Sequence, residues 1–338
     1  MNIREIARRA GVSTATVSRA INRIPTVDPH LSKRVWKIAE EMGYYPSTQA
    51  RALVSGKSRT LGLIVSEITN PFFPEIVQSF ENIAVQHNYE ILLSSTVDDP
   101  KRMELAARRM IERRVDGVAV LTFGREESLL EHFRFRKLPV VFVDIGSHAP
   151  AVGEIRIDYR HGIRQAVQHL AALRHSSIAF IMGPESLKSA QARRAAFEKS
   201  MQEIGLSVPP QFIVAGDHTM QGGMRALTEL MKLPEPPTAV VCSNDMTAIG
   251  VLREAYDRGI VIPGEFSVVG FDDIHLSQFM IPPLTTVQMS QAELSKLAVT
   301  ALIQQVEAKN TDPRRDEYLL TTTLVLRRST ALCSRQNG

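Results

Sequence analysis

Apolar positions in the first 43 residues recur at the spacing of short helices. Residues 3–10 carry such a repeat, which Gly11 interrupts with a residue that tolerates a left-handed turn. Ser13 is a good N-cap for a second helix over 14–22, and a third helix is expected over 32–42. Two short helices joined by a glycine turn and followed by a third are typical of a helix-turn-helix unit.

From residue 61 onward, short apolar runs alternate with helical patterns. Helices are expected over 74–87 and 246–256, the second with Asp245 as its cap. Such alternation predicts parallel sheets covered by helices on both faces, and its length suits two doubly wound lobes. The fold class is therefore an all-α helix-turn-helix head and an α/β body of two parallel-sheet lobes. The expected strands are Leu61–Val65, Ile91–Leu93, Val118–Leu121, Val140–Val143, Ile178–Met182, Phe212–Val214, Ala239–Cys242 and Ser267–Phe271.

Charge separates the head from the body. Residues 1–60 contain eleven Lys and Arg but only four Asp and Glu, a net charge of +7, whereas the chain as a whole carries +4. A small basic head on a mildly acidic body favours contact between the head and a polyanion.

Several classes of protein lack support in the sequence. Cys242 and Cys333 are the only cysteines, too few for a disulfide framework or a four-thiolate zinc site. There is no His-Glu-x-x-His helix, no Gly-x-Ser-x-Gly elbow and no apolar run long enough to span a membrane. We therefore expect a cytoplasmic protein that is not an enzyme, needs no metal or cofactor and has no membrane contact.

The second helix presents a surface suited to the DNA major groove. Thr14, Ala15 and Ser18 have short side chains, so the helix can lie deep in the groove. Threonine can hydrogen-bond a base edge, alanine can contact a thymine methyl group, and Arg19 can reach guanine.

Motifs along nearly the whole chain resemble the lac/galactose repressor family. The head motif covers Ile3–Asn22, and two further motifs of the family follow at Gly43–Pro46 and Ala50–Leu53. In the body the resemblance rests on Ser243–Asp245, Val269–Asp273 and Ile281–Thr286. It implies a body like a periplasmic binding protein, with a ligand cleft between its lobes.

For DNA, the resemblance implies a homodimer on a near-palindromic double-stranded operator, with one recognition helix in each of two successive major grooves. It also implies hinge helices that enter the minor groove, where Leu53 would be wedged into a base step and Arg51 would contact phosphate. The residues expected to contact DNA are Thr14, Ala15, Thr16, Ser18, Arg19, Asn22, Arg51 and Leu53.

For the cleft, ligands of doubly wound sheets bind beyond the carboxyl ends of the strands. Asp144, Asn244 and Asp272 follow predicted strands, and their oxygen and amide groups suit sugar hydroxyls. The resemblance adds Arg193 as an effector-contacting arginine, with selectivity set by Phe72, Phe73, Leu187, Ser189 and His218. A sugar or sugar derivative is the expected effector, and the sequence leaves open whether it induces or corepresses.

The expected organisation has four parts. They are a head over 1–46, a hinge over 47–60, a first lobe over 61–158 plus 289–317, and a second lobe over 159–288 plus 318–330. The tail from Arg327 has no leucine heptad of the kind that forms tetramers, so a dimer is expected.

Two alternatives stay open. In one, the DNA-binding role is kept but a protein corepressor replaces the small effector. In the other, the chain is a small-molecule binding protein with no role on DNA, although receptors of that kind carry a secretion signal where this chain has a basic helical head.

Overall fold

The computed structural model describes residues 3–22, 24, 26–44, 56–97, 99–122, 133, 138–144, 153–307 and 317–334. The chain forms two compact units, residues 1–59 and residues 60–338, and each is described by itself. Among the described residues, no helix is both long and apolar enough to cross a membrane.

The first unit is the predicted three-helix module. It contains α1 (Ile3–Ala10), α2 (Thr14–Ile21) and α3 (Pro29–Glu41), whose apolar faces meet around Ile6, Val17 and Val35. The third helix begins three residues earlier than expected, because the Asp28 carboxylate caps it by accepting a hydrogen bond from the backbone N–H of Leu31 at 2.9 Å. The Trp36 indole N–H donates to the Ala20 carbonyl and ties α3 to α2.

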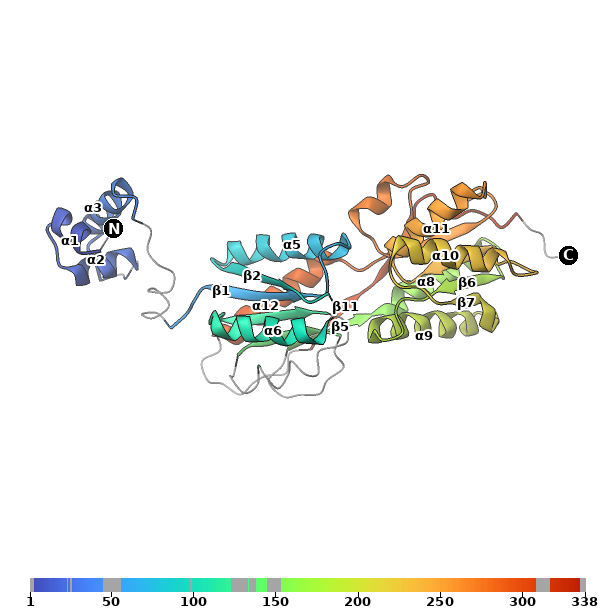
Figure 1. The fold of residues 1–338 in the computed structure, drawn as a ribbon, viewed down its shortest axis with the longest axis horizontal. Coiled ribbons are helices and arrows are strands. Elements are labelled where there is room, and N and C mark those ends of the chain that lie inside the picture. The colour runs from blue at the N-terminus through green and yellow to red at the C-terminus, as the bar shows by residue number, and fades with distance from the viewer. Residues whose placement is uncertain are drawn as a thin grey trace. The chain divides into compact units, whose positions relative to one another are not determined.

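The second unit contains two lobes, each built on a six-stranded sheet (Figure 1). The strand order of the first sheet is β11-β5-β4-β3-β1-β2, and its neighbouring strands pair in parallel. These strands are β1 (Thr60–Val65), β2 (Glu90–Ser95), β3 (Gly117–Leu121), β4 (Val140–Val143), β5 (Gly153–Asp158) and β11 (Glu317–Thr321).

Helices cover both faces of this first sheet. α6 (Pro100–Glu112) packs its Met and Ala side chains on one face, against residues such as Ile64 and Val118. α5 (Phe72–Gln86) and α12 (Gln291–Glu307) pack on the other, against residues such as Leu63. Figure 1 shows α5 and α6 on opposite sides of the strands. Successive residues of one strand thus enter different cores, which is why the strands are continuously apolar.

The second sheet has the order β12-β10-β9-β8-β6-β7, and only the β10–β12 pair is antiparallel. α10 (Met220–Met231) and α11 (Asp245–Asp257) cover one face, and α8 (Tyr159–Ala172) and α9 (Lys188–Glu203) cover the other. The strands are β6 (Ile178–Ile181), β7 (Ile213–Val214), β8 (Ala239–Cys242), β9 (Ser267–Asp272), β10 (Thr285–Gln288) and β12 (Thr323–Val325).

The chain passes between the lobes at three places. It leaves the first sheet where β5 ends at Asp158, and it returns between the end of β10 and the start of α12. The expected lobe bounds put the third passage between residues 317 and 318, but it lies at Thr322. The reason is that β11 pairs with β5 through Thr321, and the next strand belongs to the second sheet. Residues 318–321 therefore lie in the sheet of the first lobe.

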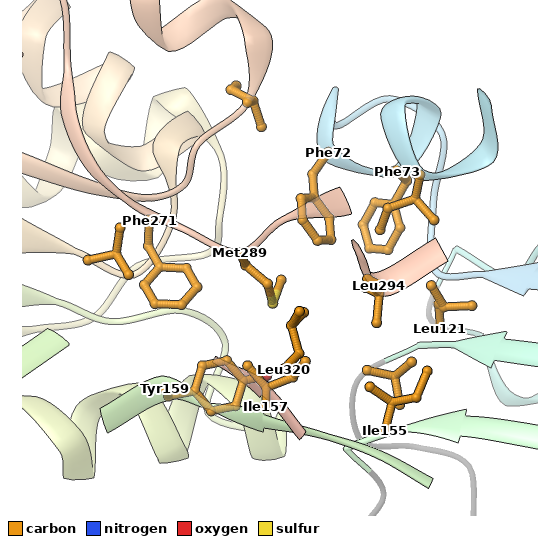
Figure 2. Close-up of a cluster of buried hydrophobic side chains, with 14 of the residues drawn as sticks. Phe72, Phe73, Leu121, Ile155, Ile157, Tyr159, Phe271, Met289, Leu294 and Leu320 are labelled. Atoms are coloured by element: carbon orange, nitrogen blue, oxygen red, sulfur yellow. The ribbon is translucent and has the colours of Figure 1, made fainter. Parts of the chain in front are cut away.

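A continuous apolar cluster joins the two lobes. Figure 2 shows Phe72 and Phe73 of α5 and Leu294 of α12 near Met289, with Phe271 of β9 and Tyr159 of α8 on the other side. Polar contacts also join the lobes: the backbone N–H of His275 donates to Glu75 Oε1 at 2.9 Å, and the side-chain amide of Gln291 donates to the Asp272 carbonyl at 3.2 Å. His275 begins the short helix η2 (His275–Phe279).

Candidate functional site

A cavity lies between the two lobes where several strands end. Ser66 and Glu67 follow β1, Thr122 follows β3, and Asp272 ends β9. Such positions are where ligands of doubly wound sheets bind. The described lining residues are Ser66, Glu67, Asn70, Phe72, Phe73, Thr122, Leu187, Ser189, Arg193, His218, Asn244 and Asp272.

Arg193 is held in the cavity by contacts with a carbonyl, a carboxylate and two aromatic rings. It projects from α9, and its Nη1 donates to the Ser243 carbonyl at 2.5 Å while its Nη2 lies 3.5 Å from Asp272 Oδ1. Its guanidinium carbon lies 4.0 Å from the ring centre of Phe271 and 5.2 Å from that of Tyr159. Stacking on aromatic rings and pairing with a carboxylate both suit the planar guanidinium.

Asp272 faces Arg193 from the end of β9. Its side chain is only 6% exposed, and burial raises its pKa to about 8 while Arg193 opposes the shift. Oδ1 has no hydrogen-bond partner among the described residues, although the guanidinium lies within ion-pair distance. The backbone of Asp272 has φ +110°, a rare conformation for a residue with a side chain and one that often marks functional sites.

His218 and Asn244 form the wall of the cavity beside Arg193. His218 also has a left-handed backbone, φ +61°, and its Nε2 lies 3.0 Å from Ser243 Oγ. Burial lowers its pKa to about 3, so the imidazole is neutral near pH 7. The Asn244 amide donates to the His218 carbonyl at 3.1 Å.

Asn244 also caps α11, in place of the expected Asp245. Its Oδ1 accepts from the backbone N–H of Thr247 at 2.9 Å, so the helix begins one residue earlier than predicted. The Asp245 carboxylate instead accepts hydrogen bonds from the Ser277 and Thr286 hydroxyls at 2.6 and 2.5 Å and from the Ile274 N–H at 2.9 Å. Burial raises its pKa to about 7.

The structure gathers eight of the nine predicted effector residues around this one cavity. The exception is Asp144, which does not line it. Asp144 lies close to Tyr159 and Arg193, both of which act against the increase in its pKa that burial causes. Four lining residues were not predicted: Ser66, Glu67, Asn70 and Thr122. Ser66 and Thr122 directly follow a strand, and Glu67 comes next after Ser66. The rule that ligands bind beyond the carboxyl ends of the strands could therefore have found these three.

The second helix of the head presents the expected polar surface. Thr14, Ala15 and Arg19 are exposed, and Ser18 is half-buried. Two predicted DNA contacts also make bonds within the helix: Thr16 Oγ1 lies 2.9 Å from the capping Ser13 Oγ, and the Asn22 amide donates to Ser18 Oγ at 3.4 Å. The other two predicted contacts, Arg51 and Leu53, lie outside the described residues.

Within the described ranges, no group of three or more His, Cys, Asp or Glu side chains is placed to hold a metal ion. A helix-turn-helix unit in one chain with a two-lobed body and an interlobe cavity defines a DNA-binding regulator with a ligand-binding body. Two family models support this class: bacterial regulatory proteins of the lacI family match residues 2–47, and the periplasmic binding protein-like domain matches residues 167–330.

Relatives extend the match to almost the whole chain. The HTH-type transcriptional repressor PurR of Actinobacillus pleuropneumoniae serotype 3 (strain JL03) is 32% identical over 97% of each chain. PurR of Aliivibrio fischeri (strain MJ11) is 32% identical over 96% of this chain and 98% of its own. The chain therefore belongs to the lacI family of bacterial regulatory proteins and is a DNA-binding transcriptional repressor.

Solved structures agree on the fold. The lac repressor dimer bound to operator and the anti-inducer ONPF has a TM-score of 0.87 at 26% identity, covering 98% of this chain and 99% of its own. The transcriptional regulator CelR in complex with cellobiose has a TM-score of 0.73 at 26% identity. The match covers 97% of this chain and 99% of the CelR chain.

Proposed function

We propose that the chain acts as a homodimer that binds a near-palindromic operator and is controlled by a small effector in the interlobe cavity. The observation that carries this proposal is the cavity itself, whose polar lining comes from both lobes. A ligand that contacts both lobes binds one interlobe angle better than another, and it shifts the equilibrium by that difference in affinity.

The DNA role of individual residues follows from the exposed face of α2. Thr14, Ala15 and Arg19 are the direct base contacts, with Ser18 beside them, and Thr16 and Asn22 complete the surface. The hinge over residues 47–60 supplies the second contact, with Leu53 in the minor groove and Arg51 on phosphate. The operator-bound lac repressor dimer supports the dimeric arrangement.

The effector class is a sugar or sugar derivative. The lining has hydroxyl, amide and carboxylate groups that can pair with several hydroxyls, for example Ser66, Asn70 and Asn244. Phe72 and Phe73 provide an apolar side for a carbon skeleton. The cellobiose complex of CelR supports the same class.

Selection of bound duplexes from a random pool by the purified full chain tests the DNA role. The expected product is a site with two inverted halves. Arg19→Ala should weaken binding to that site, since a good arginine–guanine contact contributes about 1–3 kcal/mol of discrimination. Lys37→Ala on α3, where the lysine is 79% exposed, is the matched control for lost charge. Recovery of no common sequence would refute the proposal.

A further inference from the structure

The three passages between the lobes are short. In the first, β5 ends at Asp158 and α8 begins at the next residue, Tyr159. In the second, Met289 and Ser290 lie between the end of β10 and the start of α12, and in the third only Thr322 lies between β11 and β12. A change in the angle between the lobes must therefore be absorbed by a few backbone dihedral angles at these points.

Thr322 is the residue at which the chain changes sheets in the third passage. Thr321 before it pairs with Asp158 in the first sheet, and Thr323 after it pairs with Gln288 in the second. The Thr322 side chain is fully buried. Because Thr322 itself pairs in neither sheet, its backbone is free to bend when the lobes rotate.

The Thr322 hydroxyl joins the third passage to the first. Its Oγ1 donates to the Asp158 carbonyl at 2.6 Å and accepts from the backbone N–H of Gly162 at 3.0 Å. Asp158 ends a strand of the first lobe, and Gly162 lies in the first turn of α8 in the second lobe. Since hydrogen bonds weaken steeply as their angles change, these two bonds favour one direction of the Thr322 side chain and hence one lobe angle.

The second passage meets the other two at Gly162. A Cβ atom at this position would lie 2.3 Å from Val287 Cγ1 and 2.7 Å from Thr322 Oγ1. Val287 lies in β10, just before the second passage. The missing side chain of Gly162 therefore lets all three passages approach one turn of α8, where a rotation of the lobes displaces them least.

The second passage is also connected to the cavity. The backbone N–H of Met289 and the side-chain amide of Gln291 donate to the Asp272 carbonyl at 3.4 and 3.2 Å, and Asp272 lines the cavity. Figure 2 shows Met289 close to Phe271, the residue before Asp272. A ligand that moves the Asp272 backbone therefore acts on a passage that the Thr322 hydroxyl does not hold.

We propose that Thr322 is a positioning residue of the hinge, whose hydroxyl fixes the point about which the lobes rotate and sets the lobe angle of the ligand-free chain. The first and third passages are held at this point, and the second passage carries the movement that a ligand causes. This assignment rests on the proposed function, because the lobe angle is the quantity that the effector is proposed to control.

The test compares three substitutions in the full chain. Thr322→Val keeps the shape of the side chain and removes both hydrogen bonds, whereas Thr322→Ser keeps the hydroxyl. Thr323→Val is the matched control, because it makes the same chemical change at an exposed neighbour. Circular dichroism and the melting temperature show that each variant is folded.

The lobe angle is measured by pulsed electron–electron double resonance between two spin labels. The labels are attached at Glu104→Cys on α6 and Lys199→Cys on α9, both of which are exposed positions. Cys333→Ser removes the more accessible native thiol, and Cys242 is buried. Labelled chains are mixed with excess unlabelled chain, so that distances within one subunit dominate.

Thr322→Val should raise the population of other interlobe distances by about two- to tenfold for each hydrogen bond lost. Thr322→Ser and Thr323→Val should keep the native distance distribution. The affinity of Thr322→Val for the selected operator should change by about threefold or more, because apparent affinity scales with the fraction of chains in the competent arrangement.

The outcomes separate the two proposals. An unchanged distance distribution in Thr322→Val, even with a lower melting temperature, overturns the assignment and leaves the proposed function intact. An equal change in Thr323→Val also overturns it. A changed distribution in Thr322→Val alone, with unchanged operator affinity, supports the hinge assignment but contradicts control of DNA binding by the lobe angle.

Discussion

Neutral His218 makes the stability of the body depend on pH. Its pKa in the folded chain is about 3, because of burial first and the nearby Arg193 second, and in the unfolded chain it is about 6.5. The folded state therefore binds fewer protons than the unfolded state below pH 6.5. The stability contributed by the neutral imidazole is fully present above pH 6.5 and is lost as the pH falls from 6.5 towards 3.

The size of this loss of stability follows from the pH interval over which the unfolded chain binds the additional proton. Between pH 7.5 and 5.0, only the range below 6.5 contributes, and about 1.5 pH units correspond to at most ~2 kcal/mol. The side chain is in part accessible from the cavity, and water there reduces the penalty. We therefore expect His218 to account for about 1–2 kcal/mol of the free energy of unfolding lost over this range.

The measurement compares the native chain with His218→Asn in urea unfolding at pH 7.5 and 5.0, followed by circular dichroism. Asparagine tolerates the left-handed backbone at this position better than most residues. Burial also lowers the pKa of His169 and His175, but both remain in the two chains, so their contributions cancel in the difference.

His87→Asn, at an exposed imidazole after α5, is the matched control and should keep the native pH dependence. Equal losses of the free energy of unfolding in the native chain and His218→Asn between the two pH values would show that His218 does not cause the pH dependence.

Three further changes test other parts of the molecule. Ser13→Ala removes the side-chain cap of α2 and should cost about 1 kcal/mol in urea unfolding, and an unchanged midpoint would contradict the cap. Gly250→Ala places a methyl group 1.9 Å from the Met220 carbonyl, so α10 and α11 must separate, at about 1–3 kcal/mol or more; native stability would refute this packing. Leu53→Ala should weaken operator binding in a mobility-shift titration but leave effector binding intact, and equal operator affinity would exclude the wedge.

Strands that appear as apolar runs in the sequence were predictable, whereas β5, β10, β11 and β12 were not. β3 and β8 are buried along their whole length, so each appears in the sequence as an uninterrupted apolar run. β5 contains Glu154 and Arg156, and β11 at the sheet edge has exposed residues, so neither has that pattern. β10 and β12 lie at the lobe crossings, where pairing depends on partners far away in the chain.

The residues of the candidate site were predictable where they lie beyond the carboxyl end of a strand, because ligands of doubly wound sheets bind there. Asn244 and Asp272 follow strands and line the cavity, and the same rule applies to Glu67, which also lines it. The partners of these side chains were not predictable. Only the folded chain shows that Asn244 rather than Asp245 caps α11. The carboxylate of Asp245 instead binds Ser277, 32 positions further along the chain.

The interlobe contact and the cavity share the same elements, which gives the effector a direct mechanical connection to the lobe angle. Asn244 lines the cavity, and the adjacent Asp245 holds the segment around Ile274 through its buried carboxylate. The next residue, His275, donates its N–H across the lobe boundary to Glu75 of α5. The start of that helix in turn supplies Phe72 and Phe73 to the cavity. A ligand that displaces either aromatic ring or Asn244 therefore acts on an element at one end of the Glu75–His275 bond. Because packed interfaces tend to have discrete arrangements, small displacements at the cavity can change the angle between the lobes as a whole.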